Sequence, residues 1–150
     1  MERACWPLRR WRAVGDASGF AMIRKIGLLV VRQNRLLLCR KSRGTTLLIL
    51  PGGKPDGEET EEQALEREIE EELGTTASAI EHFGRYEDEA AGDPRRVCIS
   101  LYTGVLADEP VASGEIAELV WFGPNDDAAL ISPSLRRQIL PDLLRRGILR

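Results

Sequence analysis

Residues 53–75 read GKPDGEETEEQALEREIEEELGT, and this stretch decides how the rest of the chain is interpreted. Leu65, Ile69 and Leu73 recur every four residues, which predicts a helix from about 58 to 73 with one buried stripe. Thr60 and Gln63 have the spacing of a capping box at its start. Gly74 suits the position just after its end.

The acidic residues of this helix form a second face. Glu68, Glu71 and Glu72 are spaced i, i+3, i+4, so their carboxylates lie together, roughly a quarter turn from the apolar stripe. Like charges at these spacings repel, and no basic residue follows Glu68 on the helix. Oxygen ligands on a rigid helix suit Mg²⁺, for which Mn²⁺ can substitute. The other interpretation of the pattern is a solvated acidic helix.

The whole stretch resembles the Nudix box, GX₅EX₇REUXEEXGU, in which U is apolar. Every specified position matches except the last, where Thr75 replaces an aliphatic residue. Leu50-Pro51-Gly52 and residues 115–122 also resemble the context of this family, so that the resemblance extends over roughly residues 24–145. It implies an α/β/α sandwich with a mixed β-sheet. It also implies an enzyme that hydrolyses a phosphoanhydride bond of a nucleoside-diphosphate-X substrate.

The resemblance also implies roles for individual residues. The expected metal ligands are Glu68, Glu71, Glu72 and the backbone carbonyl of Gly52. Among the acids, the expected catalytic residues are Glu71, Glu72 and Glu115, and either Glu72 or Glu115 could be the general base. The expected structural positions of the motif are Gly53, Glu59, Arg67 and Gly74, with Glu59 and Arg67 forming a salt bridge.

Basic residues near the motif are candidates for contacts with phosphate or ribose. They are Arg40, Lys41, Arg43 and Lys54, and for each of them a solvated surface charge is the alternative. Glu87, Asp88 and Glu89 are expected in a loop, as a further acidic cluster that could touch metal.

The remaining elements indicate an α/β sandwich. Apolar runs predict strands at 25–31, 35–40, 47–50, 80–86, 97–106 and 118–122, and the first two flank the hairpin signal Gln33-Asn34. Ser132-Pro133 opens a final helix, which Pro141 is expected to kink or end.

Length and composition fit one domain, residues 22–150, preceded by an Arg-rich extension, residues 1–21, that is peripheral or not native. The net charge is −3, although residues 53–75 hold ten acidic and two basic residues, so the remainder is basic. Three widely spaced cysteines match neither a disulfide framework nor a zinc site, and a reducing cytoplasm is expected. No apolar run is long enough to span a membrane.

The group X is not specified by the motif. Markers that some branches of the family carry beyond the box are absent: Ala90 stands where ADP-ribose hydrolases tend to have proline. This favours a (d)NTP pyrophosphatase over an ADP-ribose or nucleotide-sugar pyrophosphatase. A non-catalytic nucleotide-sensing module is the alternative of another class. The expected partner is a small nucleotide, with no membrane and no stable nucleic-acid partner, and a homodimer is left open.

Overall fold

The computed structural model describes residues 22–150, so the expected extension 1–21 lies outside it. The elements of the described part, in chain order, are β1 Ile23–Leu29, β2 Val31–Arg32, β3 Arg35–Lys41, β4 Gly52–Gly53, α1 Glu61–Leu73, β5 Ala77–Glu89, β6 Arg96–Leu106, β7 Ile116–Phe122, η1 Ala128–Leu130, η2 Leu135–Ile139 and α2 Leu140–Arg145. Within this part of the chain, no helix is long and apolar enough to cross a membrane.

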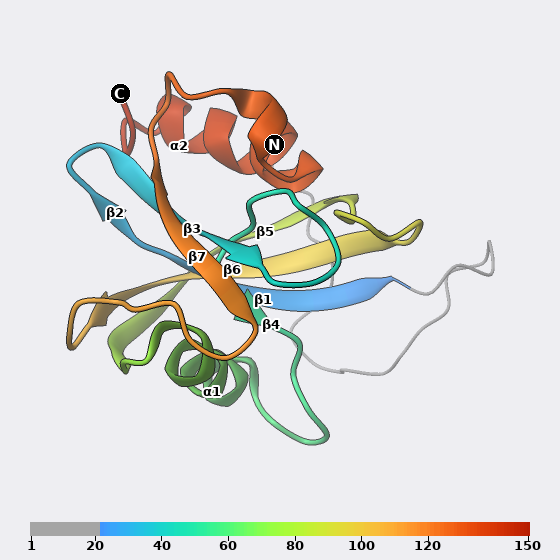
Figure 1. Cartoon of the computed structure of the whole chain (residues 1–150), viewed down its shortest axis with the longest axis vertical. Helices are drawn as coiled ribbons and strands as arrows, with labels where there is room; N and C mark the ends of the chain where they lie inside the picture. Colours follow the sequence, from blue (N-terminus) through green and yellow to red (C-terminus); the bar gives the residue numbers. More distant parts are fainter. Residues whose placement is uncertain (1–21) are drawn as a thin grey trace.

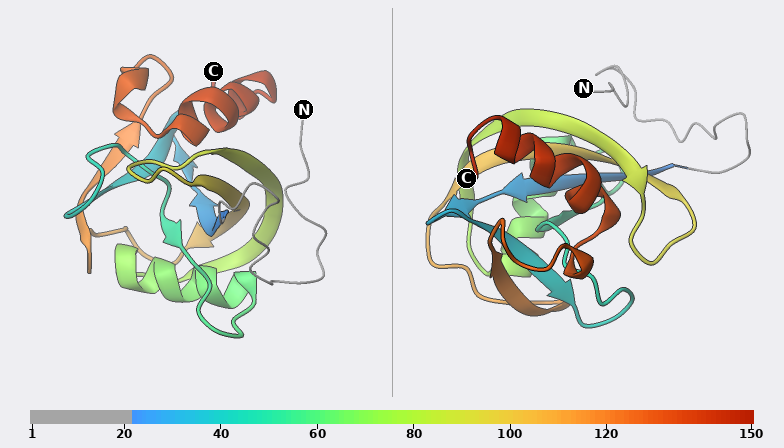
Figure 2. Two further views of the ribbon diagram at one scale, coloured as in Figure 1. Left: turned by 90° about the vertical axis from the view of Figure 1, so that its right-hand side faces the viewer. Right: turned by 90° about the horizontal axis from the view of Figure 1, so that it is seen from above.

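The strands form a layer between two helical layers. In Figure 1, α1 lies below the strands and α2 lies above them, and the turned views of Figure 2 agree. The C-terminal helix consists of η2 and α2, which follow one another without a break. One sheet has the order β4-β1-β6-β5, in which β1 and β6 are parallel and the other pairs are antiparallel. The predicted α/β/α sandwich with a mixed sheet is confirmed.

A second sheet of order β2-β3-β7 was not predicted. The first hairpin strand divides at Val30, whose carbonyl accepts a 2.9 Å hydrogen bond from the N–H of Leu37 in β3. β1 therefore pairs with β6, while its continuation β2 pairs with β3. The hairpin turn itself is confirmed: Gln33 and Asn34 have φ values of 50° and 60°, as a two-residue turn between antiparallel strands requires.

Each helical layer covers its own apolar cluster. The predicted stripe of α1 is fully buried and packs with Ile26 and Leu28 of β1. On the other side, Leu135, Ile139 and Leu143 pack with residues of β3 and β6. Cys39 and Cys98 are both buried, as expected of small core residues.

Two strand predictions need correction. Residues 47–50 form no strand, because Ile49 bridges to Cys39 on one side while Leu48 bridges to Ile131 on the other. The segment thus makes single contacts with two partners and no ladder with either. The strand predicted at 80–86 is longer and runs from Ala77 to Glu89, so Glu87, Asp88 and Glu89 are strand residues, not a loop.

The predicted disturbance at Pro141 takes the form of a wider helical turn. Proline has no N–H to donate to a carbonyl four residues earlier. The N–H of Leu140 bonds to the carbonyl of Leu135, five residues earlier, and the helix continues as α2. Pro141 therefore widens the helix without ending it.

Candidate active site

α1 is fixed at both ends by the residues that the sequence pointed to. Thr60 is the N-cap, and Gln63 completes the capping box with hydrogen bonds of 3.0 and 3.1 Å. The helix begins at Glu61, three residues later than predicted, because the cap leaves residues 58–60 outside the helix. Gly74 ends it in the left-handed conformation, with φ 62°.

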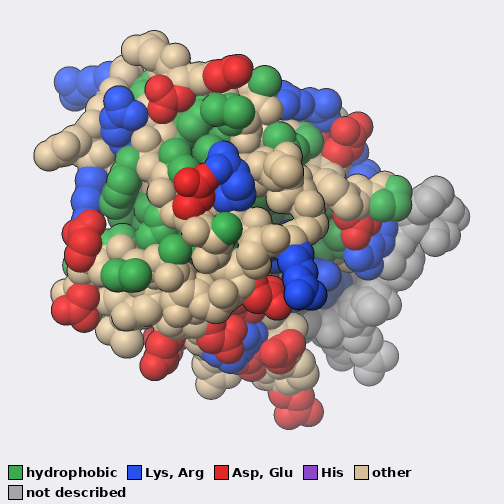
Figure 3. All heavy atoms as spheres, in the orientation of Figure 1, with side chains coloured by type: hydrophobic (Ala, Val, Ile, Leu, Met, Phe, Trp, Pro, Cys, Tyr) green, Lys and Arg blue, Asp and Glu red, His purple; other side chains and the backbone are tan. Residues whose placement is uncertain are grey.

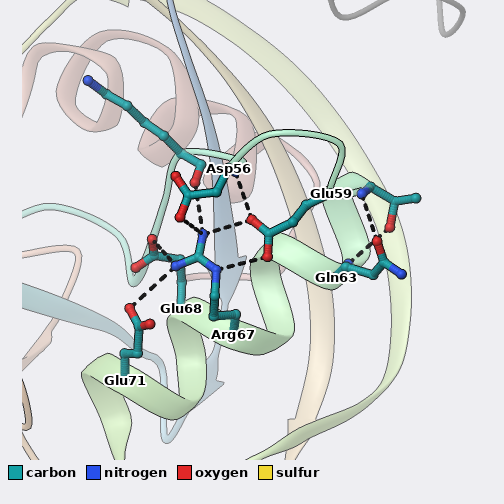
Figure 4. Close-up of polar contacts among 8 residues, drawn as sticks. Asp56, Glu59, Gln63, Arg67, Glu68 and Glu71 are labelled. Carbon is teal, nitrogen blue, oxygen red and sulfur yellow. Dashed lines mark hydrogen bonds and ion pairs between the residues drawn. The ribbon is translucent and has the colours of Figure 1, made fainter.

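Arg67 joins the loop before α1 to the acidic face of the helix (Figure 4). Its guanidinium donates to both carboxylate oxygens of Glu59, at 2.9 and 3.0 Å, and to the carbonyl of Lys54 at 3.1 Å. The same group donates to Glu68 at 3.0 Å and to Glu71 at 3.4 Å. These bonds, above all those with Glu59, hold the pKa of Arg67 above its ordinary range. The expected pair is thus present within a larger network.

Glu68 lies against the backbone of Gly53. A side-chain carbon at residue 53 would lie 2.5 Å from the carboxylate carbon of Glu68. Residue 53 therefore has to be glycine for lack of space. The absence of a side chain there lets the carboxylate of Glu68 lie against β4. The adjacent Gly52 is also constrained, with φ 142° and no room for a Cβ, which would lie 2.0 Å from the carbonyl oxygen of Ile26.

Glu72 is the buried member of the acidic face, with 7% of its surface exposed. Its Oε2 atom has no hydrogen-bond partner within the described chain. Burial, and then a hydrogen bond and charge repulsion from Glu68, raise the pKa of Glu72 to about 8, although a hydrogen bond to the Gly52 backbone acts in the opposite direction. A buried, incompletely satisfied carboxylate is costly unless a cation or hydrogen bond compensates it.

Exposure increases along this face. The side chain of Glu68 is 17% exposed and that of Glu71 is 58% exposed. Figure 3 shows acidic side chains gathered at the lower edge of the molecule, where α1 and the preceding loop lie. In residues 22–150 no three acidic, histidine or cysteine side chains converge as a metal-binding group. Arg67 holds the carboxylates of Glu68 and Glu71 by ion pairs of its own, which accounts for why these carboxylates do not converge on one point.

The loop between β6 and β7 docks onto the C-terminal end of α1. The N–H groups of Val111 and Ser113 donate to the carbonyls of Leu73 and Glu72, at 2.9 and 3.0 Å. These bonds satisfy carbonyls that a helix end leaves without partners. They bring the next residues, including Glu115, to the rim of the acidic face. Ser42 secures this position through two hydrogen bonds to the carbonyl of Glu115.

A cavity of about 740 Å³ opens between these elements. It is lined by the expected metal-binding residues Gly52, Glu68, Glu71 and Glu72, by Glu115, and by the expected phosphate-binding residues Lys41, Arg43 and Lys54. Its size lies in the range of small-ligand sites, roughly 300–1,000 Å³. Carboxylates and basic side chains therefore meet in a single site.

The structure excludes some sequence candidates and adds one residue. Arg40 does not line the cavity; it forms an ion pair with Glu118 and donates to the carbonyl of Thr46. The acids at 87–89 do not line it either, since they pair with Arg96 and Arg137. Lys25 of β1 was not predicted from the sequence as a site residue, yet it lines the cavity. Its place within an apolar strand gave no sign of which face it would occupy.

The residues present fit Mg²⁺ or Mn²⁺. Glu68, Glu71 and Glu72 supply hard oxygen ligands, and no histidine or cysteine of residues 22–150 lines the cavity. The unpartnered Oε2 of Glu72 is an atom that a cation would satisfy. Thr75, the one departure from the motif, is buried, and its hydroxyl accepts a 3.0 Å bond from the N–H of Asp108. It supports the loop behind the helix end and does not reach the cavity.

Comparisons with known proteins agree with this arrangement. A family model described as NUDIX domain matches residues 21–143. The "Putative 8-oxo-dGTP diphosphatase" of Bacillus subtilis is 32% identical over 113 residues, which cover 75% of this chain and 74% of that protein. The CTP pyrophosphohydrolase of Escherichia coli is 30% identical over 110 residues, covering 70% and 78%. The crystal structure of a MutT NUDIX hydrolase from Burkholderia pseudomallei superposes with a TM-score of 0.66 at 28% identity, covering 76% and 92%.

Proposed function

The chain belongs to the NUDIX domain family, and from that premise we propose that it is a metal-dependent pyrophosphatase of nucleoside triphosphates. In this reaction water attacks the α- or β-phosphorus and the phosphoanhydride bond between these two phosphates breaks, which yields the nucleoside monophosphate and pyrophosphate. The observation that carries the proposal is the pairing, in one cavity, of a buried unsatisfied carboxylate, Glu72, with basic side chains.

Each group in the cavity has a role suited to its chemistry. Glu68, Glu71, Glu72 and the carbonyl of Gly52 would hold Mg²⁺ or Mn²⁺, which neutralises phosphate charge and lowers the pKa of water. Glu72 and Glu115 are the two candidates for the general base. Glu72 is buried on the helix, whereas Glu115 is exposed on a loop tied to the helix end. Lys41, Arg43 and Lys54 would bind the phosphate chain.

The substrate class is supported by two independent observations. The two relatives above carry names that refer to 8-oxo-dGTP and CTP, both of which are nucleoside triphosphates. In this chain, basic residues of the cavity lie on several separate segments, which suits a chain of phosphates more than a single one. ADP-ribose and nucleotide sugars are the alternative substrates.

A product analysis tests the proposal. The full chain is incubated with Mg²⁺ and a panel of dNTPs, 8-oxo-dGTP, CTP, ADP-ribose, UDP-glucose and diadenosine tetraphosphate, and the products are separated. The expected result is monophosphate plus pyrophosphate from triphosphates, with activity abolished by EDTA and restored by Mg²⁺ or Mn²⁺. Preferential cleavage of ADP-ribose or UDP-glucose would select the alternative substrate class. Full activity in EDTA would refute the metal-dependent reaction.

A nucleotide-sensing module without catalysis remains the alternative of another class. It predicts saturable nucleotide binding with no product from any member of the panel at high enzyme concentration. The presence of all three motif carboxylates in the cavity favours hydrolysis over sensing.

A further inference from the structure

The lysines of this chain have an unusual distribution. Only three of its 21 basic residues are lysines, Lys25, Lys41 and Lys54, and all three line the cavity. Arginines behave differently: of those in residues 22–150, only Arg43 lines it, and most of the others form ion pairs with acidic residues. The planar guanidinium suits fixed pairing, whereas lysine presents a mobile point charge that can follow an anionic ligand.

Lys25 lies where two parts of the cavity meet. The wide part, which contains the carboxylates, is lined by all three lysines. A narrower extension of about 50 Å³ lies toward the C-terminal helix and is lined by Lys25 and Lys41 but not by Lys54. Most of its remaining lining is apolar, with Val97, Ile99 and Leu135 among the residues. Lys25 and Lys41 thus stand between the acidic face and an apolar recess.

The lysines repel one another when no anion is bound. β1 pairs with β4 through Ile26 opposite Gly53, so Lys25 and Lys54 are each the chain neighbour of a residue of this pair. Burial, and then the charges of Lys41 and Lys54, lower the pKa of Lys25, although the charges of Glu72 and Asp93 act in the opposite direction. Within residues 22–150, the ammonium of Lys25 has neither a hydrogen bond nor an ion pair. An anion between these lysines would remove the repulsion.

We propose that Lys25 binds the phosphate nearest the nucleoside, and that it holds the nucleoside monophosphate product while Lys54 binds the pyrophosphate end. The proposal rests on the proposed function, because it presumes a nucleotide polyphosphate in this cavity. The apolar recess beyond Lys25 suits part of a flat base, whose faces are apolar, whereas the acidic face and Lys54 lie on the other side. Lys25 is therefore a binding residue that fixes the direction of the substrate in the site.

Binding of the two products separately tests this assignment. Titration calorimetry in Mg²⁺ measures the affinities of dGMP and of pyrophosphate for Lys25→Met, Lys54→Met and the matched control Arg136→Met. Arg136 lies in η2 and lines neither part of the cavity. Lys25→Met should weaken dGMP about tenfold or more, as expected for a lost charge-assisted hydrogen bond, and pyrophosphate by much less. Lys54→Met should show the reverse, and Arg136→Met should bind both ligands normally.

A structural role for Lys25 would give different results. The ligand-free melting temperature of Lys25→Met should be equal to or above that of the wild type, because a repulsion is removed, and Lys25→Arg should restore part of the dGMP affinity. Normal dGMP binding by Lys25→Met, or equal loss of both ligands together with a lowered melting temperature, would overturn the proposal.

Lysine acetylation separates this proposal from the proposed function. In the wild type, dGMP should slow the reaction of Lys25 with acetic anhydride more than that of Lys54, as followed by mass spectrometry of peptides. Protection of Lys25 in a protein that hydrolyses no triphosphate would support the binding assignment while refuting the proposed function. Triphosphate hydrolysis with equal labelling of Lys25 in the presence and absence of dGMP would refute only the assignment.

Discussion

The carboxylate of Glu68 lies against Gly53 so closely that a Cβ at residue 53 would lie 2.5 Å from its Oε1 atom. Replacing Gly53 with alanine must therefore displace the end of a flexible side chain. We expect Gly53→Ala to fold nearly normally but to require about tenfold more Mg²⁺ for half-maximal activity, the cost of disturbing the support of a metal ligand. A Mg²⁺ titration of triphosphate hydrolysis measures this change.

Gly52→Ala is the matched comparison. Its Cβ would lie 2.0 Å from the backbone oxygen of Ile26, and its φ of 142° is one that residues with side chains rarely adopt. The backbone cannot yield as a side chain does, so this variant should lose several degrees of melting temperature. An unchanged Mg²⁺ requirement in Gly53→Ala would mean that Glu68 does not bind metal.

Two acids of α1 that are two residues apart, Glu70 and Glu72, should differ sharply in their contribution to catalysis. Glu72 is buried beside the cavity, whereas Glu70 is exposed and lies about 160° around the helix from it. Glu72→Gln should lower kcat about a hundredfold or more through lost metal binding or water activation. Glu70→Gln should leave kcat within about twofold. Both rates are measured at saturating Mg²⁺.

The same two variants should also differ in metal-free stability. Glu72→Gln removes a buried acid whose pKa burial raises to about 8, so that folding at neutral pH no longer requires this group to take up a proton. The melting temperature of this variant in EDTA should therefore rise by about 2 °C or more. Glu70→Gln should melt like the wild type. Wild-type turnover by Glu72→Gln, or equal inactivation of both variants, would place the metal on a different face of the helix.

Arg67 should not be replaceable by lysine. Arg67→Lys keeps the charge but loses the paired bonds to Glu59 that fix the loop before α1. Activity at low Mg²⁺ should fall about tenfold, as for other residues that orient metal ligands. Glu59→Gln breaks the same pair from the other side, so the two losses should not add in the double variant. Additive losses would show that Arg67 acts independently of Glu59.

What the sequence predicted correctly depends on local interactions. The Thr60–Gln63 capping box, the Gly74 helix end and the Gln33-Asn34 turn each involve residues close in the chain, whose conformations are set by those residues themselves. The periodicity of Leu65, Ile69 and Leu73 likewise identifies a buried face without knowledge of its partner. The position of Glu72 at the edge of that face follows from helix geometry alone.

The remaining features depend on contacts between distant segments. Residues 47–50 have the apolar composition of a strand, yet their bridges to Cys39 and Ile131 leave no room for a ladder. The approach of Glu115 to the helix is set by hydrogen bonds of Val111 and Ser113 to helix carbonyls, which have no signature in composition. The sequence does not single out Lys25, because the pairing of β1 with β4 and β6 decides on which side of the sheet this side chain lies.

A buried hydrogen bond attaches the C-terminal helix to the sheet. Tyr86 of β5 donates a 2.6 Å hydrogen bond to Asp142 of α2, and both side chains are buried. Burial raises the pKa of Asp142, but the bond from Tyr86 and the charges of Arg146 and Arg145 together outweigh it and hold this pKa below the ordinary value. Removing the hydroxyl leaves a buried carboxylate with one partner fewer. Tyr86→Phe should therefore cost about 1–3 kcal/mol near pH 7.

The pH dependence of the stability lost in Tyr86→Phe tests whether Tyr86 acts through Asp142. A carboxyl group whose pKa is lowered on folding stabilises the folded state above its unfolded pKa, near ~3.9 for aspartate, and this contribution is lost as the pH falls below that value. The difference between wild type and Tyr86→Phe should consequently be constant from pH 7 to about pH 5 and shrink toward pH 3. Urea unfolding measures this difference in the free energy of unfolding. In an Asp142→Asn background, Tyr86→Phe should lower the free energy of unfolding by less. A difference that persists undiminished at pH 3, or in the Asp142→Asn background, would show that the phenol stabilises the helix by packing and not through this carboxylate.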